Sequence, residues 1–352
     1  MKQVILVGKG AEHEDLPRVL ELGIPVLTSW QAIDLLDNDH PMNFGRPGIY
    51  GQPCANKILF HAESVIALGC RCSLWAVGYN FRPKELIMVD IDRLETDRYP
   101  FCVPHNVHAA QFIGTYHFEP SPVEWLTECN SYRANWIEGE PTFGTYINPY
   151  HFVNEINKMM REDQIIVTDT GTPYIVCHQV MKIRRPQRLI ASGGLSEMGA
   201  GLPGAIGAVI AAKLPVIMMS GDGGFMMNIQ ELATIAGKEL PVKSIVFNNG
   251  GYNMIRRSQE NLGYVPRGTA EPDLTIPSFC RVARGFDLPA VEVRSWDDFW
   301  RVVPWFMGYK GPALMELFTS PDQPLLKLNP SKNPDGTINS PEFWDLTMKA
   351  PA

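Results

Sequence analysis

Apolar residues in the first third of the chain form short continuous runs, separated by stretches with a helical repeat or by turn residues. Continuous apolar runs are typical of strands buried on both faces, and the stretches between them are typical of helices packed on such a sheet. This alternation predicts a parallel, doubly wound α/β sheet. The predicted strands of residues 1–110 are 4–10, 24–29, 64–72 and 85–92, and the predicted helices are 15–23 and 55–62.

The same alternation returns in the second half of the chain, after a stretch of weak periodicity at 111–150. We therefore predict two doubly wound α/β domains, at 1–140 and 151–325, with a linker at 141–150 and a surface tail at 326–352. Outside the segment described below, the further predicted elements are helices at 123–139, 150–163, 196–213, 251–264 and 277–286 and strands at 164–171, 188–194 and 313–318.

Composition and charge narrow the class of protein. Of the 352 residues, 45% are hydrophobic and 20% are charged, as in ordinary globular proteins. The net charge of −7 and the lack of a basic stripe argue against a nucleic-acid partner. No apolar segment approaches the roughly 20 residues that span a bilayer, and MKQVILVGKG lacks the pattern of a signal peptide. The seven scattered cysteines favour reduced thiols and a cytoplasmic location.

The segment 215–254 carries the chemistry that the sequence suggests. Two apolar runs, ending in Ser-Gly-Asp-Gly-Gly and Asn-Asn-Gly-Gly, enclose a helical repeat. If the two strands are parallel, Asp222 and Asn249 lie at the same edge of the sheet, where open α/β sheets bind ligands. A carboxylate and an amide oxygen beside glycine amides suit Mg²⁺ that also holds phosphate oxygens. The competing interpretation is two ordinary turns, because Asp-Gly and Asn-Gly are common turn dipeptides.

The sequence GDG, followed after 24 residues by NN, resembles the cofactor signature of thiamine diphosphate-dependent enzymes. The flanking GGLSEMGAGLPGAIGA and NIQELATIAGKELPVK are similar to the acetolactate synthase and pyruvate oxidase branch of that family. The motifs LVGKG, GIPVLTS, DHPMNFGRPGIYG, ALGCR and IMVDID resemble the central domain of the same branch. The resemblance implies a central domain at 1–140 and a thiamine diphosphate-binding domain at 151–325.

Site residues follow from the resemblance, position by position. Asp222, the Asn249 side chain and the Gly251 carbonyl would bind Mg²⁺. Met198 would be the large apolar residue over which the cofactor bends, although it also fits an ordinary core residue. Ser196 lies where the family usually has Gly; its carbonyl can serve the aminopyrimidine provided that the loop does not require glycine. The other cofactor contacts that the resemblance implies are Gly171, Thr172, Gly221, Gly223, Gly224 and Met254.

The resemblance also implies an activating glutamate, to which no position of this sequence corresponds. In the family, the activating Glu lies in a pyrimidine-binding domain, and nothing in this sequence resembles that domain. We therefore expect the activating Glu on a separate partner subunit, in a heterotetramer or larger assembly; a truncated form of a longer chain is the alternative. Some members of the branch bind FAD in the central domain. Here Gly8-Lys9-Gly10 lacks a third glycine, so FAD is not favoured.

The function that the resemblance implies is decarboxylation of a 2-oxo acid, most simply pyruvate, and transfer of the acyl-anion unit to a carbonyl acceptor. A simple 2-oxo acid decarboxylase and a non-catalytic module that binds thiamine diphosphate or a nucleotide are the alternatives. Arg256 and Arg257 lie in the stretch that contributes to the acceptor pocket of acetolactate synthases. They either bind an acidic or phosphorylated acceptor through paired hydrogen bonds or are solvated helix residues.

Overall fold

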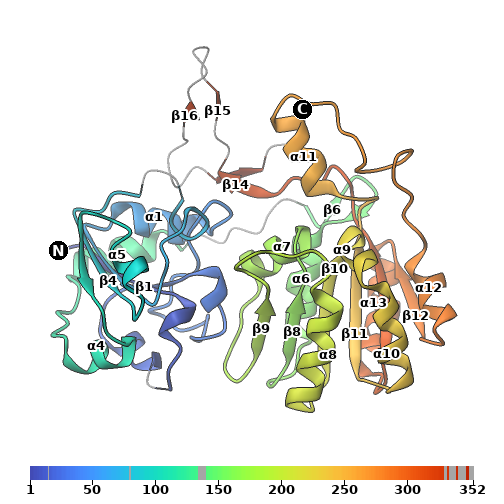
Figure 1. Ribbon diagram of the computed structural model, residues 1–352, viewed down its shortest axis with the longest axis horizontal. Helices are drawn as coiled ribbons and strands as arrows, with labels where there is room; N and C mark the ends of the chain where they lie inside the picture. The colour runs from blue at the N-terminus through green and yellow to red at the C-terminus, as the bar shows by residue number, and fades with distance from the viewer. Residues whose placement is uncertain are drawn as a thin grey trace. The chain divides into compact units, whose positions relative to one another are not determined.

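Two structural units make up the chain (Figure 1). The computed structural model describes residues 1–328 except 15, 79–80 and 134–139, together with the strands 331–332, 338–339 and 346–348. The first unit comprises Met1–Trp136, Lys182–Arg185 and Leu326–Lys349, and the second comprises Ile137–Met181, Pro186–Leu325 and Ala350–Ala352. Within the described residues, no helix combines the length and the apolar character that a bilayer span requires.

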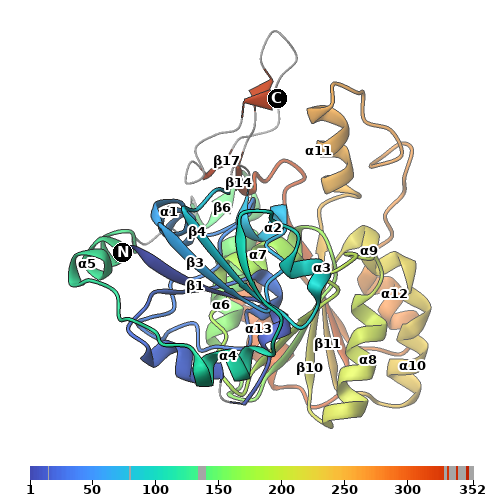
Figure 2. The same cartoon turned by 60° about the vertical axis from the view of Figure 1, so that its left-hand side comes forward.

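The first unit is built on a five-stranded parallel sheet, as the apolar runs predict, with β1, β3 and β4 side by side (Figure 2). In sheet order the strands are β2 (Val26–Thr28), β1 (Gln3–Val7), β3 (Ser64–Leu68), β4 (Glu85–Val89) and β5 (Cys102–His105). The helices are α1 (Pro53–His61), α2 (Leu74–Val77), α3 (Arg93–Thr96), α4 (Ala109–Thr115) and α5 (Val123–Ser131), with 3-10 turns at Lys9–Ala11, Leu16–Glu21 and Trp30–Ala32. Strand β5 and helices α2, α3 and α4 were not predicted.

The direction of winding in the first unit reverses between β1 and β3, which is where such sheets bind nucleotides. Here the two loops pack on each other. A Cβ on Gly8 would lie 2.2 Å from the Gly69 carbonyl oxygen, so the missing side chain serves this loop contact. Lys9 forms ion pairs with Glu12 and Asp34. The Gly-Lys-Gly motif therefore has a structural explanation that requires no nucleotide.

The second unit is built on a six-stranded sheet whose strands are all parallel. In sheet order the strands are β12 (Ala290–Val293), β13 (Ala313–Phe318), β11 (Val242–Asn248), β10 (Val216–Gly221), β8 (Ile165–Thr168) and β9 (Arg188–Ala191). The helices are α6 (Pro149–Lys158), α7 (Thr172–Val180), α8 (Gly201–Ala212), α9 (Asp222–Met227), α10 (Leu232–Gly237), α11 (Asn253–Asn261), α12 (Phe279–Gly285) and α13 (Trp296–Gly308), with a 3-10 turn at Ile229–Glu231.

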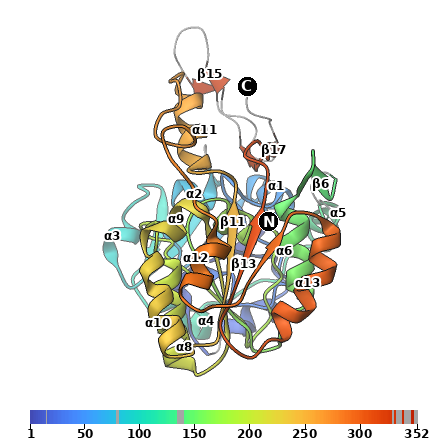
Figure 3. The same ribbon diagram turned by 90° about the vertical axis from the view of Figure 1, so that its right-hand side faces the viewer.

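Helices cover both faces of this sheet. In Figure 3, α8, α10 and α12 lie on one face, and α6 and α13 lie on the other. The strands between them are buried almost throughout, and Phe225 of α9 packs edge-on against Phe279 of α12 in the core. The predicted fold class, two doubly wound parallel-sheet domains, is confirmed.

Some predicted element boundaries are wrong. The helix predicted at 196–213 begins only at Gly201, because Ser196 and Gly199 have positive φ angles of 55° and 88° that interrupt a helix. Pro203 is the third residue of α8, in the first turn where proline is tolerated. The single helix expected between the two turns is divided into α9, a 3-10 turn and α10.

The segment predicted as a linker, 141–150, contains regular structure. Strands β6 (Thr142–Phe143) and β7 (Tyr146–Ile147) form a short hairpin. Asn148 then caps α6 by accepting a hydrogen bond from the Tyr150 amide. Of the predicted helix 123–139, residues 134–139 lie outside the described residues. The predicted tail is described only at β14 (Leu326–Leu328), β15 (Ser331–Lys332), β16 (Ile338–Asn339) and β17 (Leu346–Met348).

Candidate functional site

The candidate site lies in the second unit, at the carboxyl ends of β8, β10 and β11. From β8 the chain passes to β9 on one side, and β10 then lies on the other side of β8. A reversal of this kind opens a crevice at the carboxyl ends of the strands, which is the usual ligand site of open α/β sheets. The predicted cofactor segments after β8 and β10 both reach this place.

Asp222 joins the turn after β10 to the turn after β11. Its carboxyl Oδ2 accepts hydrogen bonds from the amides of Asn249 at 3.0 Å and Gly251 at 2.8 Å. Its Oδ1 accepts from the Gly223 amide at 2.7 Å. The structure thus brings Asp222 and Asn249 together at one edge of the sheet, as the strand–helix–strand pattern predicts.

The Asp222 carboxylate is buried without a basic partner. Its exposed fraction is 1%, and the ion pairs found among the described residues do not include it. Burial raises the pKa of Asp222 to about 6, although the amides of Gly251, Gly223 and Asn249 lower it in part. A buried negative charge held only by amide dipoles suits a bound cation.

Asn249 supplies a second oxygen at the same place. Its side chain is buried, and its Oδ1 has no hydrogen-bond partner in the described part of the chain. An unsatisfied buried acceptor costs about 1–3 kcal/mol, so such atoms are uncommon in folded proteins. Metal coordination would satisfy this oxygen. The orphan Asn249 Oδ1 beside the Asp222 carboxylate therefore fits a hard divalent cation.

Two glycines of these turns, Gly223 and Gly251, are required by contacts within the protein itself. A Cβ on Gly223 would lie 2.2 Å from the Tyr252 ring, and a Cβ on Gly251, at φ 134°, would lie 2.1 Å from the Thr269 carbonyl oxygen. Gly221 precedes α9 as its N-cap residue. Sequence reasoning assigned these glycines to a ligand and missed the packing role of Tyr252 and Thr269.

Two other predicted cofactor segments border the same crevice. Gly171, at φ 89°, is the N-cap residue of α7, and Thr172 is the first residue of that helix. Ser196 is exposed and adopts the left-handed conformation at φ 55°, which the family meets with glycine and which serine adopts at a cost. Met198 and Met254 are both half-buried. The contacts of these five residues with a cofactor stay a prediction.

Asp169 is a functional candidate that sequence reasoning missed. It follows β8, has an exposed fraction of 2%, and accepts hydrogen bonds from the Gly199 amide and the Ser220 hydroxyl. Burial raises its pKa, and the hydrogen bonds oppose that shift. The available signal was an aspartate at the end of a buried strand, in the sequence TDTG.

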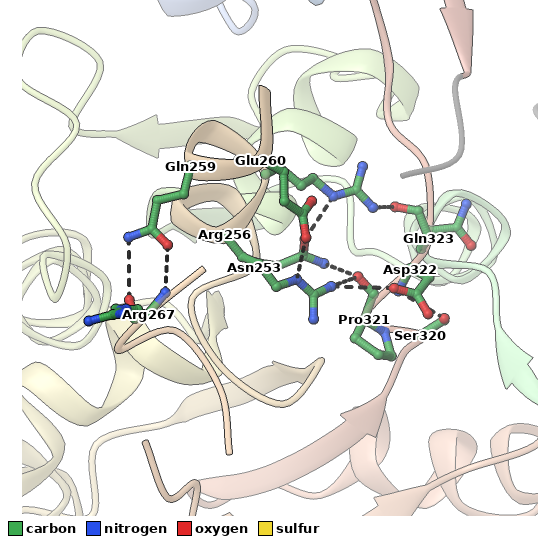
Figure 4. A network of polar contacts seen from close by, with 10 residues as sticks. Asn253, Arg256, Gln259, Glu260, Arg267, Ser320, Pro321, Asp322 and Gln323 are labelled. Carbon is green, nitrogen blue, oxygen red and sulfur yellow. Dashed lines mark hydrogen bonds and ion pairs between the residues drawn. The ribbon is translucent and has the colours of Figure 1, made fainter. Parts of the chain in front are cut away.

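The two arginines of α11 hold the segment after β13 (Figure 4). Arg256 donates to the Pro321 carbonyl and lies 3.5 Å from an Asp322 carboxyl oxygen. Arg257 donates to the Gln323 carbonyl and, at 2.8 Å, to Asn253 Oδ1. Both side chains therefore contact the protein itself, and their contact with an acceptor stays a prediction. Helix α11 itself stands beyond the carboxyl edge of the sheet (Figures 1 and 3).

Comparison with known proteins agrees with this architecture. Residues 1–112 match the central domain of thiamine pyrophosphate enzymes, and residues 169–317 match the C-terminal TPP binding domain of thiamine pyrophosphate enzymes. Acetolactate synthase 2, chloroplastic, of Zea mays is 29% identical over 356 residues, covering 94% of this chain and 55% of that protein.

Two microbial relatives give a similar result. The acetolactate synthase isozyme 1 large subunit of Escherichia coli K12 is 30% identical over 90% of this chain and 58% of its own length. The probable acetolactate synthase large subunit of Methanocaldococcus jannaschii is 30% identical over 94% of this chain and 59% of its own length. The chain thus spans a little more than half the length of these relatives. With both family domains present in order, the chain belongs to the thiamine pyrophosphate enzymes, of which it contains the central domain and the C-terminal TPP-binding domain.

Proposed function

We propose that this chain binds thiamine diphosphate and Mg²⁺ at the carboxyl edge of the second sheet. The observation that carries the proposal is that, among the described residues, the buried Asp222 carboxylate has no basic partner and the Oδ1 of Asn249, whose amide binds this carboxylate, has no hydrogen-bond partner. Asp222, Asn249 and the Gly251 carbonyl are the proposed metal ligands. The diphosphate would lie against Gly221, Gly223, Gly224, Gly171 and Thr172, and the rings against Ser196, Met198 and Met254.

The proposed reaction is decarboxylation of a 2-oxo acid, most simply pyruvate, with transfer of the acyl-anion unit to a carbonyl acceptor. Bound thiamine diphosphate supplies the electron sink that this chemistry needs, and the protein supplies binding and orientation. The similarity to proteins named acetolactate synthases supports the carbonyl acceptor. A Cβ on Gly221 or Gly250 would meet open space, which leaves room for a ligand at these turns, and Asp222 fixes both turns relative to each other.

We further propose that activity needs a pyrimidine-binding domain that lies outside these 352 residues and carries the activating Glu. A separate subunit in a heteromeric assembly is the form that we expect. The chain matches only the central and C-terminal domains of the family and spans a little more than half of its relatives, which supports a contribution from elsewhere.

Cofactor binding is the first test. Calorimetric titration of the chain with thiamine diphosphate should give Mg²⁺-dependent binding, and Asp222→Ala should abolish it. Asp163→Asn, a substitution at a partly exposed carboxylate of the same unit, is the matched control and should bind as the wild type does. If Asp222→Ala bound the cofactor with unchanged affinity, the metal-site proposal would be wrong.

Turnover is the second test. Co-expression with a candidate pyrimidine-domain subunit, followed by an assay with pyruvate, thiamine diphosphate and Mg²⁺, should restore activity that the chain alone lacks. A branched 2-hydroxy-3-oxo acid as product supports transfer to a carbonyl acceptor, whereas a free aldehyde indicates simple decarboxylation. Full activity of the chain alone would refute the need for a further domain. A flavin absorbance spectrum of the purified chain would reveal bound FAD.

A further inference from the structure

One buried carboxylate, that of Asp169, connects the three loops at the switch point of the second sheet. Its Oδ1 accepts from the Thr170 amide at 2.8 Å. The Gly199 amide lies 3.1 Å from both carboxyl oxygens. Its Oδ2 also accepts from the Ser220 hydroxyl at 3.1 Å and from the Gly201 amide at 3.4 Å. These donors come from three segments that are far apart in the sequence.

Each of the three segments contains residues that are proposed to contact the cofactor. The loop after β8 leads to Gly171 and Thr172, and the loop before α8 contains Ser196 and Met198. The turn after β10 contains Gly221 through Gly224. Because β8 and β10 flank the reversal of the sheet, Asp169 lies at the point from which all three segments begin or end.

Two glycines, Gly224 and Gly201, allow the backbone to pack close to the Asp169 carboxylate. A Cβ on Gly224 would lie 3.0 Å from Asp169 Oδ2, and a Cβ on Gly201 would lie 3.2 Å from the same oxygen. Ion pairs to Asp169 are not found among the described residues, so amide and hydroxyl dipoles alone compensate the charge. Such a carboxylate has fixed acceptor geometry and little freedom to move.

The contacts of Asp169 and Asp222 differ at the loop before α8, which Asp169 binds and Asp222 does not. Asp222 binds the amides of Gly223, Asn249 and Gly251, which belong to the proposed metal and diphosphate part. Asp169 holds Gly199, which directly follows Met198 in the proposed thiamine-ring part. The loop that it holds includes Ser196 at φ 55°, a strained conformation that persists only where neighbouring contacts enforce it.

We propose that Asp169 is a positioning residue that fixes the Ser196–Met198 loop for the thiamine ring system, separately from the metal anchor at Asp222. This proposal rests on the proposed function, because it assigns a role within the same cofactor site. Asp169 itself need not touch the cofactor: it acts through the Gly199 amide.

The substitution Asp169→Asn tests this directly. It keeps the size of the side chain but replaces one acceptor oxygen by an NH₂ donor. In either orientation the NH₂ group takes one of the two acceptor positions of the Gly199 amide, which lies 3.1 Å from both oxygens, and leaves this amide a single oxygen next to an opposing donor. A hydroxyl such as that of Ser220 can reorient and accept instead, whereas an amide N–H cannot. The loop should therefore be held less tightly, while the Asp222 turn stays in place.

The experiment compares two ligands on the full chain by calorimetry, both with Mg²⁺: thiamine diphosphate and inorganic pyrophosphate. Asp169→Asn should lower the affinity for thiamine diphosphate by about tenfold or more and the affinity for pyrophosphate by no more than about twofold. The difference corresponds to about 1 kcal/mol of binding free energy. Asp222→Asn should lower the affinity for both ligands alike, and Asp163→Asn should change neither affinity. A general loss of stability would lower both affinities together, so the ratio of the two reports positioning.

The outcomes separate this proposal from the function on which it rests. If the folded wild-type chain bound neither ligand, the proposed function would fail first. If it bound both and Asp169→Asn left their ratio unchanged, the positioning role would be wrong and the function would stand. Should Asp169→Asn not fold, Gly199→Ala breaks the same contact from the loop side, because its Cβ would lie 2.8 Å from the Met227 Cβ. It should shift the ratio in the same direction, and an unchanged ratio would overturn the proposal.

Discussion

At the scale of single residues, the turn after β10 depends on the absence of a side chain. A Cβ on Gly223 would lie 2.2 Å from the Tyr252 ring, closer than any real contact. Since overpacking in a tight site costs about 1–3 kcal/mol, Gly223→Ala should lower the free energy of unfolding by that amount. Gly237→Ala is the control, because a Cβ there meets open space, and it should be neutral or slightly stabilising. Urea denaturation of both variants measures the difference.

A buried lysine in β11 makes the stability of the chain depend on pH. Lys243 has an exposed fraction of 6% and donates to the Gly311 carbonyl at 2.5 Å, with the Tyr309 ring 4.7 Å away. Burial lowers the pKa of Lys243 to about 8. Between pH 8 and about 10.5 the unfolded chain therefore binds more protons than the folded one, and the stability that Lys243 contributes rises with pH across that window.

Substitution of this lysine by an apolar residue of similar length isolates its contribution. As the pH rises across the same window, the free energy of unfolding of the wild type should increase by about 2–3 kcal/mol relative to that of Lys243→Met, because methionine has no charge to lose. The exposed Lys238→Met should show no such trend. Chemical denaturation at pH 8 and pH 10 gives the comparison. A constant difference between wild type and Lys243→Met would show that Lys243 titrates normally in the folded chain.

At the scale of elements, Glu316 of β13 ties its neighbours together. Its exposed fraction is 0%; its Oε1 accepts from Asn248 of β11 at 2.8 Å, and its Oε2 accepts from the Cys280 amide of α12 at 3.1 Å. Asn248 in turn accepts from the Gly250 amide, in the turn that contains Asn249. One buried carboxylate thus connects a strand, a helix and the candidate metal turn.

Glu316→Gln should disturb this connection on one side. The amide oxygen can keep the bond to Asn248, but the NH₂ group then faces the Cys280 amide, which loses its acceptor. We expect a loss of about 1–3 kcal/mol in the free energy of unfolding. Glu292→Gln, at the paired position of β12 and with Arg294 as its partner, should cost less. Equal costs for the two substitutions would argue against the special role of Glu316.

The strands could be predicted because the signal for them, a continuous apolar run, is contained in the local sequence. The runs that became β1, β3, β4, β10 and β11 are continuous and apolar, as strands covered on both faces require. The start of α8 could not be predicted, because it depends on the hydrogen bond between Gly199 and Asp169, 30 residues away. No prediction covered α7, β12 or α13: β12 is mostly half-buried and lacks a continuous apolar run, and α13 contains Pro304.

The candidate site divides in the same way. Asp222 and Asn249 could be predicted because both directly follow apolar runs, and parallel pairing then places them at one edge. The role of Asp169 could not, because its partners Gly199 and Ser220 lie 30 and 51 residues further along the chain. The contacts of Arg256 likewise depend on Pro321, 65 residues away. Sequence motifs identify what directly follows a strand, but not which distant loops a side chain will hold.

At the scale of the whole molecule, the two units should respond differently to the cofactor. Both have a switch point, but in the first the Gly8 and Gly69 loops pack on each other, whereas in the second Asp222 and Asn249 present a buried charge and an orphan oxygen. Binding to the native state stabilises it by mass action, by about 2.7 kcal/mol at a ligand concentration of 100 times Kd.

Thiamine diphosphate with Mg²⁺ should therefore slow hydrogen exchange at 169–172, 196–201, 220–224 and 248–251, and leave exchange at 3–10 and 64–70 unchanged. Hydrogen-exchange mass spectrometry with and without Mg²⁺ provides the measurement and its control. Protection confined to the first unit would show that the cofactor binds there and would contradict the proposed site in the second unit.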